Sequence, residues 1–293
     1  MTMGWSLYQV TYELRSPLHI GYHKLGNLQR TRYYLPARNV WGAVTERLTR
    51  SGFTPPGTSE GHYGKVGEWV RSHCVFSYWF FQDGHTLLFP RYSDGGLRYG
   101  HLSESEFERQ YLAAHVTTAL EAETTSAEGG SVHEIEVVRP TGASGARQPV
   151  LTGWVFFDDE AASFLGAEAE WRRWLAILQV GGERRYGFGW LRMIQGGWRS
   201  ERTGQLLDDY QANCDGQRPR IQVRKGRSLL AHTITQGVRA SGVVEPLVGR
   251  ETVGSDRFGR QLTKGALCWV PGSVCRDDRW LEVSPEGIWR QPA

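Results

Sequence analysis

The sequence predicts an α+β fold in which a larger mixed part precedes a smaller β-rich part. Residues 5–14 alternate as in a strand, two later segments show helical periodicity, and this periodicity is weak after residue 219. A chain of 293 residues is natural for two small units. The expected division is a first domain at 1–195, a linker at 196–218 and a β-rich domain at 219–293.

The first strand and the first helix are separated by a long loop. The alternation at 5–14 places its apolar side chains on one face, as a half-buried strand requires. Residues 39–50 have an apolar stripe, with Asn39 placed as N-cap and Gly52 beyond the end, which predicts a helix. The loop between them contains several glycines, and residues 54–67 are expected to form another loop.

The middle of the chain reads mainly as short strands. The apolar runs at 73–81 and 86–90 predict a hairpin around Asp83-Gly84. Residues 103–112 have a weak helical pattern. Residues 133–138 and 151–157 then have the composition of strands.

A second helix and a last strand complete the first domain. Residues 160–178 predict the helix, Gly181-Gly182 end it, and residues 186–194 predict the strand. Without insertions the order is β-α-β-β-α-β, the ferredoxin-like arrangement of RNA-recognition domains. The β-rich part after residue 219 could be a degenerate second copy of this unit.

The most informative segment is 180–192, where glycines surround an Arg-Arg pair. Glycine allows close backbone approach to a ligand, and consecutive amides can bind an anion. Arginine adds bidentate donors, and the neighbouring aromatic rings could offer stacking faces. The segment could also be a helix-to-strand turn with solvated arginines. Its order of elements and its spacing exclude the dinucleotide and Walker fingerprints.

The charge is mildly basic but unevenly distributed. The formal net charge is +3, which alone does not indicate nucleic-acid binding. Residues 15–50 contain seven Lys or Arg and one acid, and residues 172–202 contain seven Arg and two Glu. These two segments could converge into one groove, with residues 104–136 as the acidic counterpart.

Cysteine and hydropathy patterns indicate a cytoplasmic protein. The four cysteines have no Cys-x-x-Cys spacing, so we expect neither a metal site nor a disulfide framework, and no cofactor. Free thiols suit a reducing compartment. The first residues lack the pattern of a signal peptide, and no apolar run has membrane-spanning length, so no membrane contact is expected.

Several motifs together resemble the RAMP (repeat-associated mysterious protein) superfamily of CRISPR systems. Leu18-His19-Ile20-Gly21, the segment 34–43 and the segment 127–136 resemble its N-terminal signature, its first-helix entry and its hairpin with a strand. The most specific match is the glycine-rich loop at 181–189. Pro36-Ala37-Arg38 replaces the family's usual Pro-Gly-Ser. Pro271-Gly272-Ser273-Val274 resembles the type III subunit that caps the 5′ handle of the guide.

The resemblance implies a non-catalytic crRNA-binding subunit of a type III-like effector complex in antiviral defence. Such a subunit holds the repeat-derived 5′ handle, and an inserted hairpin, here residues 117–133, kinks the guide. Its implied partners are the large signature subunit and a backbone subunit, with target RNA nearby. The implied RNA contacts are His19, Gly21, Lys24, Arg30, Arg32, Arg38, Gly181, Gly182, Arg184, Arg185, Tyr186, Gly187, Phe188 and Gly189.

Three alternatives remain open at this point. Residues 15–38 contain no Asp or Glu, which argues against the metal-assisted target cleavage of the superfamily's backbone subunits. A metal-independent pre-crRNA endoribonuclease would use His19 or His23 as general acid or base. The chain could also be a backbone subunit along the guide, or a scaffold that contacts only proteins.

Overall fold

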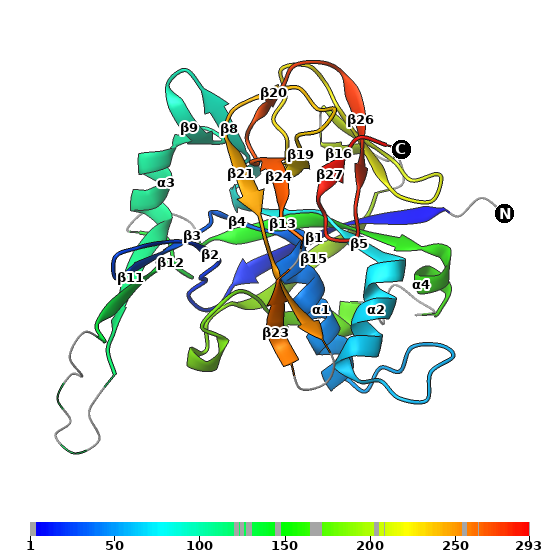
Figure 1. Cartoon of the computed structure of the whole chain (residues 1–293), viewed down its shortest axis with the longest axis horizontal. Helices are drawn as coiled ribbons and strands as arrows, with labels where there is room; N and C mark the ends of the chain where they lie inside the picture. The colour runs from blue at the N-terminus through cyan, green and yellow to red at the C-terminus, as the bar shows by residue number, and fades with distance from the viewer. Residues whose placement is uncertain are drawn as a thin grey trace.

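The computed structural model confirms a mixed α/β, strand-rich protein (Figure 1). It contains two eight-stranded sheets and several small ones among the residues that it describes. The described residues are 4–119, 123, 126, 131–143, 148–164, 172–201, 205–207, 209–253, 257–262 and 264–292.

The first large sheet is built around the strand predicted at the N-terminus. β1 (Trp5–Leu14) pairs antiparallel with β13 on one side and with β15 on the other. The strand order is β14-β15-β1-β13-β6-β4, while β5 also pairs with β13 and β7 with β6. The bounds are β4 Tyr34–Leu35, β5 Cys74–Phe76, β6 Trp79–Asp83, β7 Thr86–Leu87, β13 Val150–Asp158, β14 Ile177–Gln179 and β15 Trp190–Ser200.

Helices α1 (Ala37–Arg50), α2 (Tyr63–His73) and α4 (Asp159–Phe164) lie on one side of this sheet (Figure 1). α1 starts two residues before the predicted start, with Pro36 rather than Asn39 as N-cap. Proline suits a helix start because it has no N–H to satisfy there. The predicted loop at 54–67 is wrong at its C-terminal end, because α2 begins at Tyr63 and buries an apolar stripe.

The second predicted helix, at 160–178, is wrong at its C-terminal end. α4 ends at Phe164 and residues 172–174 are helical, while residues 165–171 lie outside the described part of the chain. Residues 177–179 form β14, which pairs with β15. A short apolar run fits a buried strand as well as a helix, so periodicity alone could not separate the two.

A smaller four-stranded sheet projects from the first one. Its order is β11-β12-β3-β2, and its strands are β2 (Gly21–Leu25), β3 (Leu28–Thr31), β11 (Leu112–Thr117) and β12 (His133–Val138). The loop predicted after β1 is therefore partly the β2–β3 hairpin. Thr117 pairs with His133 at the base of the expected 117–133 hairpin, of which residues 120–122, 124–125 and 127–130 lie outside the described residues.

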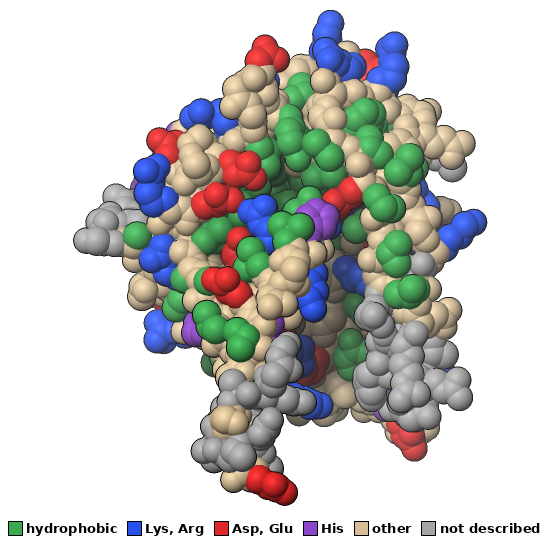
Figure 2. All heavy atoms as spheres, turned by 60° about the vertical axis from the view of Figure 1, so that its left-hand side comes forward, with side chains coloured by type: hydrophobic (Ala, Val, Ile, Leu, Met, Phe, Trp, Pro, Cys, Tyr) green, Lys and Arg blue, Asp and Glu red, His purple; other side chains and the backbone are tan. Residues whose placement is uncertain are grey.

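A three-stranded sheet and α3 lie above the projecting sheet in Figure 1. β8 (Pro90–Ser93), β9 (Gly96–Tyr99) and β10 (Leu102–Ser103) form this sheet. α3 (Glu104–Tyr111) confirms the predicted helix and begins with a capping box between Ser103 and Glu106. Figure 2 brings this side of the molecule forward and shows acidic and basic side chains intermixed over it.

The second large sheet comes from the C-terminal part of the chain. Its order is β16-β17-β18-β26-β27-β19-β24-β21. Residues 196–218, expected to be a linker, contain the end of β15 and strands β16 and β17. The bounds are β16 Gln205–Leu207, β17 Tyr210–Asn213, β18 Arg220–Val223, β19 Thr233–Ile234, β21 Val244–Leu247, β24 Ala266–Trp269, β26 Arg279–Val283 and β27 Trp289–Arg290.

Two further strand pairs lie outside the second sheet. They are β20 (Ala240–Ser241) with β25 (Val274–Cys275), and β22 (Arg250–Val253) with β23 (Arg257–Leu262).

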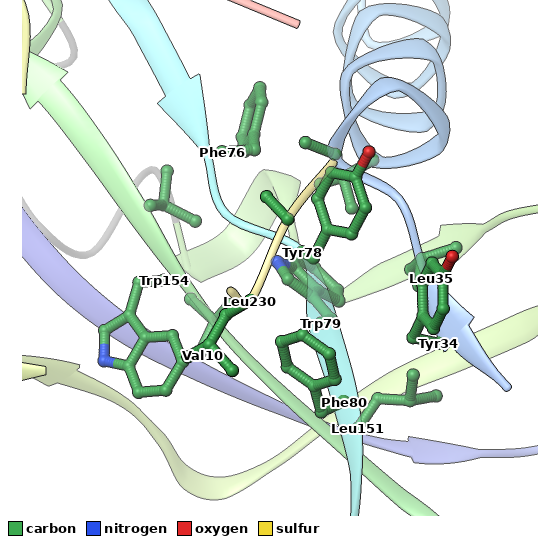
Figure 3. Packing of buried hydrophobic residues seen from close by; sticks show 14 of the residues in the cluster. Val10, Tyr34, Leu35, Phe76, Tyr78, Trp79, Phe80, Leu151, Trp154 and Leu230 are labelled. Carbon is green, nitrogen blue, oxygen red and sulfur yellow. The ribbon is translucent and has the colours of Figure 1, made fainter. Parts of the chain in front are cut away.

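One hydrophobic core spans both large sheets. Val10 and Trp154 from the first sheet belong to the same buried cluster as Leu230 and Leu281 from the second part. Figure 3 shows Leu230 beside Val10 and Trp79. Because this burial removes apolar surface of both parts from water, each part stabilises the other.

Candidate nucleic-acid interface

The glycine-rich loop between β14 and β15 is anchored on the segment that follows β1. The amide of Gly182 donates to the carbonyl of His19 at 2.8 Å, and the amide of Gly189 donates to the carbonyl of Pro17 at 2.8 Å. Two segments separated by more than 160 positions in the sequence are thereby held together. The convergence expected for the two basic segments is thus present at their backbones.

Two of the loop glycines are required by close backbone approach. Gly189 has φ +79°, and a Cβ there would lie 1.8 Å from the carbonyl oxygen of Val180. Gly181 has φ +82°, and its Cβ would lie 2.4 Å from the carbonyl oxygen of His19. Any side chain at these positions would displace the backbone beneath the loop. The glycines therefore serve the docking of the loop itself.

Gln179 fixes the shape of the loop, which the sequence did not reveal. Its side-chain amide donates to the carbonyl of Arg184 at 2.9 Å and to that of Phe188 at 3.0 Å. Residues 184–186 form one turn of 3₁₀-helix between these two contacts. The only sequence signal is a polar residue inside the apolar stretch Ile177–Val180.

The loop exposes one cation and one aromatic ring. Tyr186 is 76% exposed, and Arg185 is exposed without an ion pair in the part of the chain that the structure describes. Phe188 is buried against Ile135 and Val137 of β12, so its ring offers no stacking face. The loop presents a charge and a ring to solvent at adjacent positions, as contact with a single-stranded nucleic acid requires.

Arg184 points to the other side of the loop. Its guanidinium forms an ion pair with Glu46 of α1. Glu46 also pairs with Arg50 at 2.8 Å. Glu46 is the only acid in the basic segment 15–50, but its pairing depends on how α1 packs beside the loop, which the sequence does not specify.

The two candidate catalytic histidines have different surroundings. His19 is 5% exposed, and its Nδ1 lies 2.8 Å from the backbone carbonyl of Glu136. Because a carbonyl only accepts, Nδ1 carries the proton in this arrangement. His23 lies on exposed β2, where its ring centroid is 3.5 Å from that of Tyr22.

Of the two predicted cations in the projecting sheet, one is neutralised by acids and one is not. Arg30 pairs with Glu108 at 3.0 Å and with Glu136 at 3.4 Å. Lys24 is exposed on β2 and has no ion pair among the described residues. Figure 2 shows that acidic and basic side chains are intermixed on this side of the molecule. Arg30 is therefore a structural ion-pair partner, while Lys24 remains available to an anion.

Arg32 joins a buried network that links the two large sheets. It pairs with Glu245 of β21 at 2.7 Å, and Glu245 accepts from His232 Nε2 at 2.6 Å. The Tyr78 hydroxyl lies 2.7 Å from His232 Nδ1. Burial lowers the pKa of His232, so the neutral ring donates from Nε2 and accepts at Nδ1. Neither Glu245 nor His232 was expected to act with Arg32.

The carboxyl group of Glu245 stays ionised within this network. Burial alone would raise its pKa, but the hydrogen bond from His232 and the charge of Arg32 outweigh burial and hold the pKa at about 2. The network therefore contains one carboxylate, one guanidinium and one neutral imidazole, and its charges cancel. Arg32 is committed to a protein partner at this position.

A cavity of about 1150 Å³ adjoins the loop and brings together five of the predicted residues. It lies between α1, the glycine-rich loop and the β21–β24 end of the second sheet. The predicted residues that line it are Gly21, Arg32, Arg38, Gly181 and Arg184. Arg185, Tyr186 and Lys24 are exposed on the outer surface instead.

Neither a cluster of metal ligands nor a membrane helix occurs in the described ranges. No three His, Cys, Asp or Glu side chains there are grouped as metal ligands are. No helix in the same ranges combines the length and apolar character needed to cross a membrane.

The family of the chain follows from its sequence match over the region just described. The model of the RAMP superfamily matches residues 11–192, from β1 through the glycine-rich loop into β15. The chain belongs to the RAMP superfamily. No curated protein matches the sequence. The RAMP match thus contains the loop, the segment on which it docks and the projecting sheet.

Solved structures share the fold over most of this RAMP chain. A chain of the type III-B Cmr-beta complex bound to cognate target RNA and AMPPnP matches with a TM-score of 0.56 and 9% identity, covering 92% of this chain and 85% of that one. A chain of the same complex bound to cognate target RNA matches with a TM-score of 0.53 and 9% identity, covering 91% and 86%. The likeness extends beyond residue 192 into the second part.

Proposed function

We propose that this RAMP protein is a crRNA-binding subunit of a type III-like CRISPR effector complex. In this role it holds the repeat-derived 5′ handle of the guide and caps the complex at that end in antiviral defence. The observation that carries the proposal is the docked glycine-rich loop, which presents Arg185 and Tyr186 to solvent. Family membership and the fold shared with Cmr-beta chains support it.

The topology supports a ferredoxin-like unit as the RNA-binding domain at 1–195. The central strands run in the order β15-β1-β13-β6, each antiparallel to its neighbour, with α1 between β1 and β6 in the chain and α4 between β13 and β15. This is the order expected of a split β-α-β arrangement. The domain at 219–293 then forms the β-rich second part.

The remaining contacts follow the same proposal. Phosphate groups bind at Arg185 and Lys24, because charge-assisted contacts supply most of the affinity for a nucleic-acid backbone. The β11–β12 hairpin kinks the guide where handle meets spacer. The large signature subunit binds on one side of the protein and the first backbone subunit on the other, with target RNA close to the hairpin, in the cytoplasm.

Purification from cells that carry a CRISPR array tests the proposal. RNA extracted with the tagged full chain should be enriched in guides with a common repeat-derived 5′ end. A protein that carries no RNA and only other subunits would instead be a scaffold. Guides retained with uniform contacts along the spacer would identify a backbone subunit.

Incubation with repeat RNA in EDTA tests the enzyme alternative. The proposal expects the RNA to stay intact, because His19 is buried and held by the Glu136 carbonyl. Specific cleavage that disappears in His19→Ala or His23→Ala would replace the binding role with metal-independent processing of the precursor.

A further inference from the structure

The cavity beside the glycine-rich loop has walls from both parts of the chain. α1 and the loop form one wall, with Arg38 and Arg184. The opposite wall consists of Leu247–Gly249, next to β21, and Lys264, before β24. The guanidinium of Arg38 approaches the second wall closely, since a Cβ at Gly249 would lie 2.9 Å from its Cζ.

Positive charge is concentrated in this cavity. Five basic and two acidic side chains line it, and one of the basic ones, Arg32, is neutralised by Glu245. Glu46 and Glu286 are already engaged by Arg184, Arg50 and Arg71. Lys264 has no ion pair among the described residues. An anion entering the cavity would be attracted to the charge of Lys264.

Tyr63 shows that the charges on the α1 side act on one place. Burial raises the pKa of its hydroxyl and the Glu46 carboxylate adds to the effect, while Arg184 and Arg38 oppose it. Both guanidiniums and the carboxylate are therefore near enough to this hydroxyl for their charges to act on it. A phosphate beside Tyr63 would be subject to the charges of Arg38 and Arg184 as well as to that of Glu46.

The cavity also has apolar surface of the kind that a base and a ribose require. Trp41 contributes from α1, and Leu247 and Val248 contribute from the second wall. Its volume of about 1150 Å³ exceeds the ordinary range for a pocket that holds a small ligand, so one nucleotide fits with its neighbouring phosphates.

We propose that this composite cavity holds an unstacked nucleotide of the guide RNA, with Lys264 on the second wall facing its phosphates across from Arg38 and Arg184. The inference rests on the proposed function and extends it, because it makes the second sheet a direct RNA-binding wall. Single-stranded RNA is commonly recognised through such splayed nucleotides.

Gly42 allows the cavity to be filled without removing a charge. It lies within α1 and lines the cavity, and a Cβ there would meet only the Tyr63 hydroxyl, at 3.9 Å. Gly42→Met should therefore fold at least as stably as the wild type, because methionine is a better helix former than glycine. Gly64→Met is the matched control, since Gly64 lies in α2, outside the cavity, and its Cβ makes only ordinary contacts.

Lys264→Glu tests the second wall, and Lys65→Glu, at an exposed position of α2, is the control for an equal change of charge. Fluorescence anisotropy of a labelled single-stranded RNA oligonucleotide on the full chain gives the affinity at several salt concentrations. Gly42→Met should weaken binding at least tenfold. Lys264→Glu should lower the slope of log affinity against log salt concentration by about 0.7, as expected for one lost phosphate contact on a single strand. Both controls should bind as the wild type does.

Cross-linking of a 4-thiouridine-substituted oligonucleotide locates the contact. Attachment to peptides containing residues 38–46 and 264–267 would support the cavity. Undiminished binding in Gly42→Met and Lys264→Glu, with cross-links only at the outer loop, would overturn the cavity site and leave the proposed function standing. Failure of the wild type to bind any RNA would remove both. Adenosine monophosphate binding as tightly as the oligonucleotide would replace RNA by a free nucleotide.

Discussion

Arg32 and Glu245 form an ion pair at 2.7 Å between the first part of the chain and β21 of the second sheet. Their side chains are 14% and 13% exposed, so water screens the pair only weakly. Glu245 also receives a hydrogen bond from the buried His232. The pair therefore connects a residue that lines the cavity to β21, whose last residue belongs to the second wall.

Glu245→Ala should destabilise the protein by about 3 kcal/mol, because it leaves the Arg32 guanidinium without its buried partner. Glu68→Ala is the control, since the exposed Lys65–Glu68 pair at 3.5 Å should change stability by less than about 0.5 kcal/mol. Urea unfolding followed by tryptophan fluorescence measures both. Equal effects of the two substitutions would show that the Arg32–Glu245 pair does not hold the parts together.

The buried imidazole of His232 should make stability depend on pH near neutrality. Burial lowers its native pKa from the ordinary value of 6.5. Between the two pKa values the imidazole is therefore protonated in the unfolded chain and neutral in the native one. Stability should therefore fall as the pH drops below 6.5 toward the lowered native pKa. His232→Gln keeps a donor and an acceptor but no titration. Its unfolding free energy should lack this slope, and an unchanged slope would assign the titration elsewhere.

Features with a local sequence signal were predicted well, and features that depend on tertiary packing were not. β1 follows from alternation and α3 from the weak helical pattern at 103–112, both of which are local. α2 was missed because Gly64 and Gly67 weaken its helical signal, although Gly67 is needed where a Cβ would lie 3.0 Å from Trp41. The packing of α1 against α2 therefore determines that residues 63–73 form a helix.

The candidate site shows the same division. The glycines and Arg185 could be chosen from the sequence, because glycine spacing and adjacent cations are visible in it. The pairing of Arg184 with Glu46 and the burial of Phe188 could not, since both depend on where α1 and β12 lie in space. The sequence did not indicate Lys264 as a site residue, because the cavity wall to which it belongs is distant in sequence from the glycine-rich loop.

Gly189→Ala should release the glycine-rich loop. The new methyl group would lie 1.8 Å from the carbonyl oxygen of Val180, and φ is +79°. Gly187→Ala is the control, because φ is +83° but no atom lies within 4 Å, so only the backbone cost of about 1–2 kcal/mol applies. Limited trypsin digestion should cut after Arg184 or Arg185 much faster in Gly189→Ala. Similar rates in both variants would mean that close docking is not what holds the loop.

Arg185→Ala should weaken RNA binding without loss of stability, because Arg185 is exposed and has no ion pair in the described part of the chain. Loss of one phosphate contact should lower the slope of log affinity against log salt by about 0.7 for a single strand. Arg290→Ala removes the same charge from the second sheet, where Arg290 pairs with Glu282, and should leave the slope unchanged. A wild-type slope in Arg185→Ala would mean that the loop faces protein in the assembled complex and that the RNA contacts lie elsewhere.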